Sequence, residues 1–204
     1  MTVREIETQH GPARAHLYAA DDPRAALVLG HGAGGGVEAP DLVAAREAAR
    51  SEQITVALVE QPYRVAGRRS PAGAAQLDAA WTAVVEDLRA AELRGLPLIV
   101  GGRSLGARVA CRTAEATGAV GVLCLAFPLE PPRRAGTPPR SRLAELDAVR
   151  VPVLVVQGER DPFGIPLPGP SRTVVTVRGD HGLKADLDAV AEAVRGWLAL
   201  RQEE

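Results

Sequence analysis

The residues Gly102, Ser104 and Gly106 form a glycine–x–serine–x–glycine pattern directly after a short apolar run. Residues 98–100 are typical of a buried strand and 105–117 of a helix, so the serine falls at a sharp turn between them. Such a turn exposes the hydroxyl, and the flanking glycines let strand and helix approach closely. The pattern therefore predicts a nucleophilic serine, against the alternative of an N-cap serine at a glycine-rich helix start.

An acid and a histidine follow at the ends of two later apolar runs. Asp161 comes after the run 153–157, and His181 after the run 173–177. A serine hydroxyl is a poor nucleophile unless an imidazole takes its proton and a carboxylate holds that imidazole. The chain order serine, acid, histidine is the α/β-hydrolase order. Loops that follow parallel strands also meet at one edge of a sheet. We therefore predict a Ser104, His181, Asp161 triad.

Each partner of Ser104 has alternatives. Taken singly, Asp161 is an ordinary turn residue, and His181 is a residue of a surface loop. His31 is the rival histidine near a strand end, but it precedes the serine and lies in a glycine-rich loop. Glu159 and Asp180 are rival acids. Asp161 is favoured because the proline after it makes a turn that can direct its carboxylate toward the sheet edge.

The glycine-rich loop 30–36 supplies the second part of such a site. An oxyanion hole needs one N–H from the residue after the nucleophile and one from a loop after an earlier strand. Leu105 provides the first and Ala33 the second, with Gly34 as a neighbouring candidate. A nucleotide-phosphate loop is the competing interpretation, but neither its lysine nor the G-x-G-x-x-G spacing is present.

The remaining segments indicate how these loops are positioned. Segments 3–8 and 14–18 predict an antiparallel hairpin, and Asp41 is expected to cap the helix that follows it. Further apolar runs alternate with helical patterns, which predicts a mostly parallel sheet with helices on both faces. The 204 residues suit one α/β domain, 1–204. The expected strands are 25–29, 55–59, 98–100, 120–125, 153–157 and 173–177; the expected helices are 41–50, 74–93, 105–117, 143–148 and 187–200.

Two loops bear on the substrate. The proline- and arginine-rich segment 127–142 is too short for a lid domain and predicts an open site. The loop 60–71 follows the strand 55–59 and is expected at the edge that carries the serine. In it, Tyr63, Arg68 and Arg69 are candidate substrate-binding residues, and the two guanidinium groups suit an acidic group. The alternative is that these arginines are solvated surface residues.

The composition excludes several function classes. A net charge of −1 gives no nucleic-acid signature, and no apolar run is long enough for a membrane span. The start of the chain lacks the layout of a signal peptide, so we expect a cytoplasmic protein, and the abundant Ala, Gly, Pro and Arg indicate a bacterial genome. Cys111 and Cys124 are expected to be buried and free. No metal or cofactor is expected, and nothing indicates an oligomeric state.

The chain resembles the α/β-hydrolase superfamily, and within it the small lidless family typified by testis-expressed protein 30. Dienelactone-hydrolase-like enzymes are more distant relatives. The resemblance covers almost the whole chain through the segments 31–35, 62–69, 102–108, 158–164 and 179–181. It implies an eight-stranded, mostly parallel sheet with Ser104, Asp161 and His181 as the triad. Leu105 stands where the family pattern has Met, and Ala107 where it has Gly. Leu105 contributes only a backbone N–H.

The resulting hypothesis is a serine hydrolase that cleaves small carboxylic esters or thioesters through an acyl-enzyme. The rival hypothesis is an inactive scaffold that uses the same fold to bind a partner, since some relatives look like interaction domains. A broken triad would mark the rival, and the triad is complete in this sequence.

Overall fold

The computed structural model describes residues 1–131 and 141–200, so part of the loop predicted at 127–142 lies outside the described residues. Its centre is an eight-stranded sheet of order β1-β2-β4-β3-β5-β6-β7-β8. β2 pairs antiparallel with β1 and β4, and the other pairs are parallel, which confirms the predicted hairpin and sheet. The strands are β1 (Thr2–Ile6), β2 (Ala13–Tyr18), β3 (Ala25–Gly30), β4 (Ile54–Glu60), β5 (Leu98–Arg103), β6 (Gly121–Leu125), β7 (Val153–Gly158) and β8 (Arg172–Val177).

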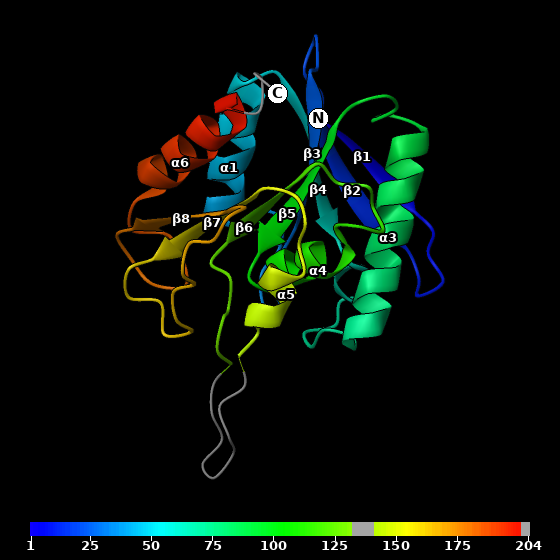
Figure 1. Ribbon diagram of the computed structural model, residues 1–204. Coiled ribbons are helices and arrows are strands. Elements are labelled where there is room, and N and C mark those ends of the chain that lie inside the picture. The colour runs from blue at the N-terminus through cyan, green and yellow to red at the C-terminus, as the bar shows by residue number, and fades with distance from the viewer. Residues whose placement is uncertain (132–140, 201–204) are drawn as a thin grey trace.

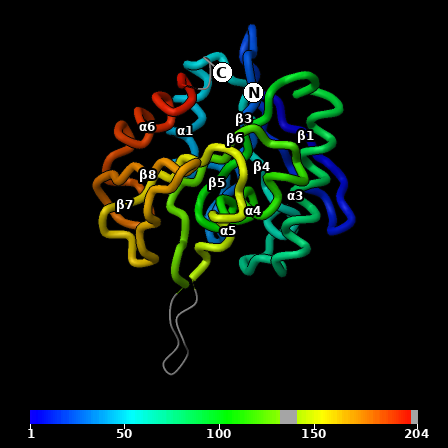
Figure 2. Tube along the Cα trace, in the orientation of Figure 1, coloured from blue at the N-terminus to red at the C-terminus, as the bar shows by residue number. Residues whose placement is uncertain are grey.

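Helices cover both faces of this sheet, as predicted (Figure 1). α1 (Pro40–Ser51) and α6 (Leu187–Ala199) pack against each other on one face. α3 (Ala74–Ala90) and α4 (Leu105–Thr113) lie on the other face, with α5 (Leu143–Asp147) against α4. Figure 2 shows the two layers on opposite sides of β5. A short helix, α2 (Pro62–Val65), was not predicted.

The burial of the strands explains this layering. All residues of β3, β6 and β7 are buried, whereas the edge strands β1 and β8 are partly exposed. Strands that are apolar on both sides need a covering layer on each face, and the core is accordingly divided into two clusters. Trp81 and Leu88 of α3 belong to one cluster, and Leu42 of α1 and Trp197 of α6 belong to the other.

One local prediction is wrong. Asp41 does not cap α1, because Ala39 is the N-cap residue and Pro40 takes the first helical position, where its missing N–H has no consequence. Asp41 lies inside the first turn, fully buried, and accepts a hydrogen bond from Arg103. The helix predicted at 105–117 also ends earlier, at Thr113.

Within the described part of the chain, no helix combines the length and apolar character needed to cross a membrane.

Candidate active site

Ser104 occupies a strained turn between β5 and α4. Its backbone has φ 51° and ψ −106°, a left-handed conformation that a residue with a side chain rarely adopts. The turn is possible because Gly102 and Gly106 both lie against the backbone of β3. A Cβ on either residue would come within 2.4 or 2.3 Å of the Gly30 carbonyl oxygen. This close approach places the Ser104 side chain, partly exposed, above the end of β5.

The structure brings Ser104, His181 and Asp161 together in one chain of hydrogen bonds. Ser104 Oγ lies 2.9 Å from His181 Nε2, and His181 Nδ1 lies 2.8 Å from Asp161 Oδ2. The carboxylate can only accept, so Nδ1 carries the imidazole proton and Nε2 is left to accept from the serine hydroxyl. This is the tautomer in which a histidine can deprotonate a serine.

Asp161 is itself held from several sides. It is almost completely buried, its Oδ1 accepts from the Phe163 N–H at 2.9 Å, and its Oδ2 accepts from Gln157 Nε2 at 2.8 Å. The Phe163 ring contacts the His181 ring edge to face, with 4.4 Å between the centroids. The carboxylate and the imidazole are therefore both fixed in orientation.

The rival residues lie elsewhere. Glu159 and Asp180 are exposed, and Asp180 Oδ1 accepts from the Gly182 N–H, whereas the two nitrogens of the His181 ring are hydrogen-bonded to Asp161 and Ser104. His31 is buried; its Nδ1–H donates to the Gly32 carbonyl at 2.8 Å, and its Nε2 accepts from the Gln61 N–H at 3.2 Å. Burial lowers the pKa of His31, which keeps its imidazole neutral. Through these two hydrogen bonds, His31 holds the start of the glycine-rich loop in position.

The predicted oxyanion residues line the same cavity as Ser104. This cavity has a volume of about 330 Å³, and Ala33, Gly34 and Leu105 are on its wall. Tyr63 does not line it. Its hydroxyl instead donates to the Ala33 carbonyl oxygen at 3.1 Å, and burial raises the pKa of Tyr63 to about 12, so the hydroxyl keeps its proton. Tyr63 therefore holds the loop that carries Ala33.

The arginines singled out in the sequence are not brought to this cavity. Arg68 lines a separate cavity of about 190 Å³ beside α3, and Arg69 is exposed. The arginines that line the cavity at Ser104, among the described residues, are Arg103, Arg108 and Arg142. The first two stand inside the serine motif region and were visible in the sequence, but helix periodicity alone does not tell which arginine faces the cavity.

Among the described residues, no three His, Cys, Asp or Glu side chains come close enough together to hold a metal ion. Cys111 and Cys124 are buried free thiols.

Comparison with known proteins places the chain in a family. Residues 23–189 match the alpha/beta hydrolase domain family, and the chain therefore belongs to it. A comparison with curated protein sequences gives no match.

Solved structures share the fold at low sequence identity. Est1E from Butyrivibrio proteoclasticus superposes with a TM-score of 0.79 at 16% identity, covering 100% of both chains. XC6422 from Xanthomonas campestris, described as a serine hydrolase without a lid, gives 0.73 at 20% identity over 96% of this chain and 94% of its own. A dienelactone hydrolase from Anabaena variabilis gives 0.77 at 15% identity over 98% and 96%. At these identities the likeness shows a shared fold.

Proposed function

We propose that this protein is a serine hydrolase that cleaves small carboxylic esters or thioesters through an acyl-enzyme. The observation that carries the proposal is the pair of hydrogen bonds that joins Ser104, His181 and Asp161 at 2.9 and 2.8 Å. The cavity of about 330 Å³ beside Ser104 is at the small end of ligand sites and suits a short acyl group.

The proposed reaction uses only this chain's residues and water. His181 Nε2 takes the hydroxyl proton as Ser104 Oγ bonds to the carbonyl carbon, and the carbonyl oxygen becomes an oxyanion. The N–H groups of Ala33 and Leu105 bind that oxyanion. His181 then gives the proton to the leaving alcohol or thiol, and the acyl group stays on Ser104. Water, deprotonated by His181, releases the acid and restores the serine.

Replacement of the nucleophile tests the proposal. Wild-type protein should be labelled by a fluorophosphonate and should hydrolyse short-chain p-nitrophenyl esters, whereas Ser104→Ala should do neither. Loss of such a nucleophile lowers turnover by up to about 10⁶-fold. Circular dichroism and thermal unfolding should show that the variant is folded. A folded wild-type protein that takes up no probe and hydrolyses no ester would contradict the proposal and favour the scaffold.

The open cavity gives a second expectation for the substrate. Among the described residues, α5 is the one helix between β6 and β7, and we propose that substrate enters without the movement of a lid. Turnover should therefore rise smoothly with the concentration of a dissolved ester. A sharp rise on emulsified long-chain lipid would count against a small, soluble substrate.

A further inference from the structure

The cavity beside Ser104 contains more positive than negative charge. Three of the described residues that line it are arginines, and two of these are paired with carboxylates. Arg103 Nε donates to Asp41 at 3.1 Å, and Arg108 donates to both carboxylate oxygens of Glu145, at 2.9 and 2.5 Å. Arg142 forms no ion pair with any residue that the structure describes.

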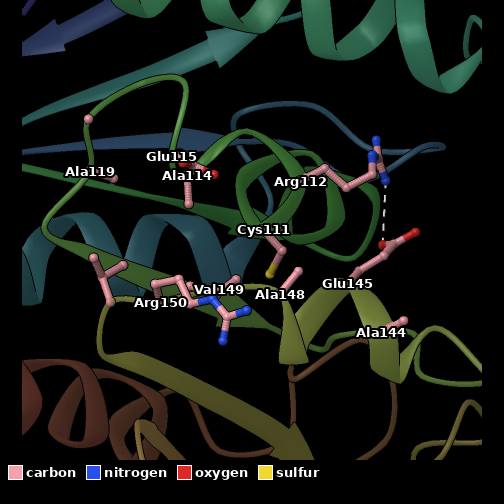
Figure 3. A pocket seen from close by; sticks show the side chains of 12 residues that line it. Cys111, Arg112, Ala114, Glu115, Ala119, Ala144, Glu145, Ala148, Val149 and Arg150 are labelled. Carbon is pink, nitrogen blue, oxygen red and sulfur yellow. Dashed lines mark hydrogen bonds and ion pairs between the residues drawn. The ribbon is translucent and has the colours of Figure 1, made fainter.

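The nearest carboxylates are already engaged. Glu145 also accepts from Arg112 at 3.4 Å (Figure 3). Arg112 in turn donates to both carboxylate oxygens of Asp78. Figure 3 shows Glu145 and Arg112 facing each other at a second cavity, so this carboxylate points toward α4. Arg108 and Arg112 are thus balanced by Glu145 and Asp78, and Arg142 is left without a counter-ion among the described residues.

The guanidinium of Arg142 is held in position by a hydrogen bond from one of its three nitrogens. Nη1 donates to the Pro128 carbonyl oxygen at 2.9 Å, which anchors the side chain at the cavity wall. Nε and Nη2, the edge that matches a carboxylate, have no partner among the described residues. Burial lowers the pKa of Arg142, and the positive charge of nearby Arg108 lowers it further. The charged guanidinium is therefore destabilised at this position, and a bound anion would stabilise it.

We propose that Arg142 binds the carboxylate of an ester that carries one, so that the preferred substrates are short half-esters of dicarboxylic acids and similar anionic esters. This inference rests on the proposed hydrolase function. Nε–H and Nη2–H donate the two parallel hydrogen bonds that a carboxylate accepts, and Arg108 adds positive charge beside them. Leu105, Pro128 and Phe163 supply the apolar wall for the short linker between carboxylate and ester carbonyl.

Matched substrate pairs measure this preference. In at least one of two pairs, the wild-type kcat/KM should be higher for the anionic ester than for the neutral one. The first pair is mono-p-nitrophenyl glutarate and the neutral p-nitrophenyl butyrate. The second pair is 4-acetoxybenzoate and the neutral phenyl acetate. Arg142→Gln should lower this anionic-to-neutral ratio about tenfold or more, the loss typical of one hydrogen-bonded charge pair. Arg142→Lys should restore part of the ratio. Arg69→Gln, which removes an exposed arginine away from the cavity, should leave it unchanged. Equal rates within both pairs, or a ratio that follows Arg69 instead, would overturn the inference.

A binding measurement separates this inference from the proposed function. Calorimetric titration of Ser104→Ala with monomethyl glutarate needs no turnover, and it should show binding that the added change Arg142→Gln weakens about tenfold or more. If the ester is bound through Arg142 but the wild type hydrolyses nothing, the proposed function fails and the anion site stands. If Ser104 is labelled and neutral esters are hydrolysed, but both titrations give the same affinity, the anion site fails alone.

Discussion

Arg103 Nη2 donates a hydrogen bond to the main-chain oxygen of His181 at a distance of 3.0 Å. Arg103 directly precedes Ser104, so this contact ties the serine turn to the histidine loop. The same guanidinium donates from Nε to Asp41, whose side chain is almost completely buried. Arg103 therefore links the serine turn, the histidine loop and the first turn of α1. This needs both the length of its side chain and the several N–H donors of its guanidinium group.

We expect Arg103→Met to lower both stability and turnover. It leaves the Asp41 carboxylate buried without its counter-ion, which costs about 3–5 kcal/mol of unfolding free energy. The double variant Arg103→Met/Asp41→Leu should recover most of that stability but not kcat, because the His181 loop still lacks its anchor. Urea unfolding and ester kinetics on both variants check this. If kcat returns together with stability, Arg103 has no role in placing His181.

The acid assignment predicts a ranking of two aspartates. Asp161→Asn replaces the one carboxylate among the described residues that forms a hydrogen bond with His181, and it disfavours the required tautomer, so kcat should fall by about 10⁴-fold. Asp180→Asn changes an exposed residue next to the histidine and should leave kcat within a few-fold of wild type. Rates with p-nitrophenyl butyrate measure both. The opposite ranking would contradict the assignment of Asp161.

The fold and the positions of the three proposed catalytic residues were accessible from sequence for a physical reason. Continuous apolar runs fix buried parallel strands, and the loops after such strands must meet at one edge. Ser104, Asp161 and His181 follow three of these runs, so their meeting required no knowledge of individual side-chain contacts. The same holds for Ala33, which follows β3.

The surroundings of the site were not accessible in this way. The direction of a long side chain depends on which partner it finds, and Arg103, Arg108 and Arg142 find theirs in segments distant in sequence. Local patterns favour Asp41 as a helix cap, and only the fold brings Arg103 to it. The sequence predicts that Tyr63 faces the substrate, whereas its hydroxyl donates to the Ala33 carbonyl oxygen.

Two helical glycines offer a direct test of the serine turn. Gly106→Ala in α4 would place a Cβ 2.3 Å from the Gly30 carbonyl oxygen, a backbone atom that cannot move aside, so we expect a loss of several kcal/mol or no folded protein. Gly196→Ala in α6 meets no atom within 4 Å and should raise stability by about 0.5–1 kcal/mol. Thermal unfolding of the two variants compares them. If the two variants are equally stable, β3 and α4 lie farther apart than in this structure.

Removal of the Tyr63 hydroxyl should affect the oxyanion loop. Tyr63→Phe loses the hydrogen bond to the Ala33 carbonyl, worth about 1 kcal/mol, so kcat should fall up to tenfold with little change in KM. Tyr18→Phe is the control, because Arg46 stacks on that ring and no hydrogen bond to its hydroxyl is found among the described residues. Rates of fluorophosphonate labelling should follow kcat. A change in KM alone would assign Tyr63 to substrate binding.

The buried His31 predicts a specific dependence of stability on pH. Burial lowers its pKa from the ordinary value of 6.5, and its Nε2 must stay unprotonated to accept from the Gln61 N–H. Above pH 6.5 the imidazole is neutral in both folded and unfolded chains and adds no pH dependence. Below it the unfolded chain takes up a proton that the folded chain refuses, so the unfolding free energy falls by up to about 1.4 kcal/mol per pH unit until the folded pKa is reached.

His31→Gln removes this proton uptake and isolates its effect. At pH 7.5 the variant should be less stable than wild type by about 1–2 kcal/mol, because the two hydrogen bonds of the imidazole are disturbed. At pH 5.5 the difference should shrink by about 1 kcal/mol, since only the wild type then loses stability through this residue. His10→Gln, at an exposed histidine in the turn between β1 and β2, should leave the unfolding free energy at pH 7.5 close to that of wild type. Urea unfolding of the three proteins measures these differences. If the difference in unfolding free energy between wild type and His31→Gln stays constant or widens on acidification, His31 is protonated in the folded protein.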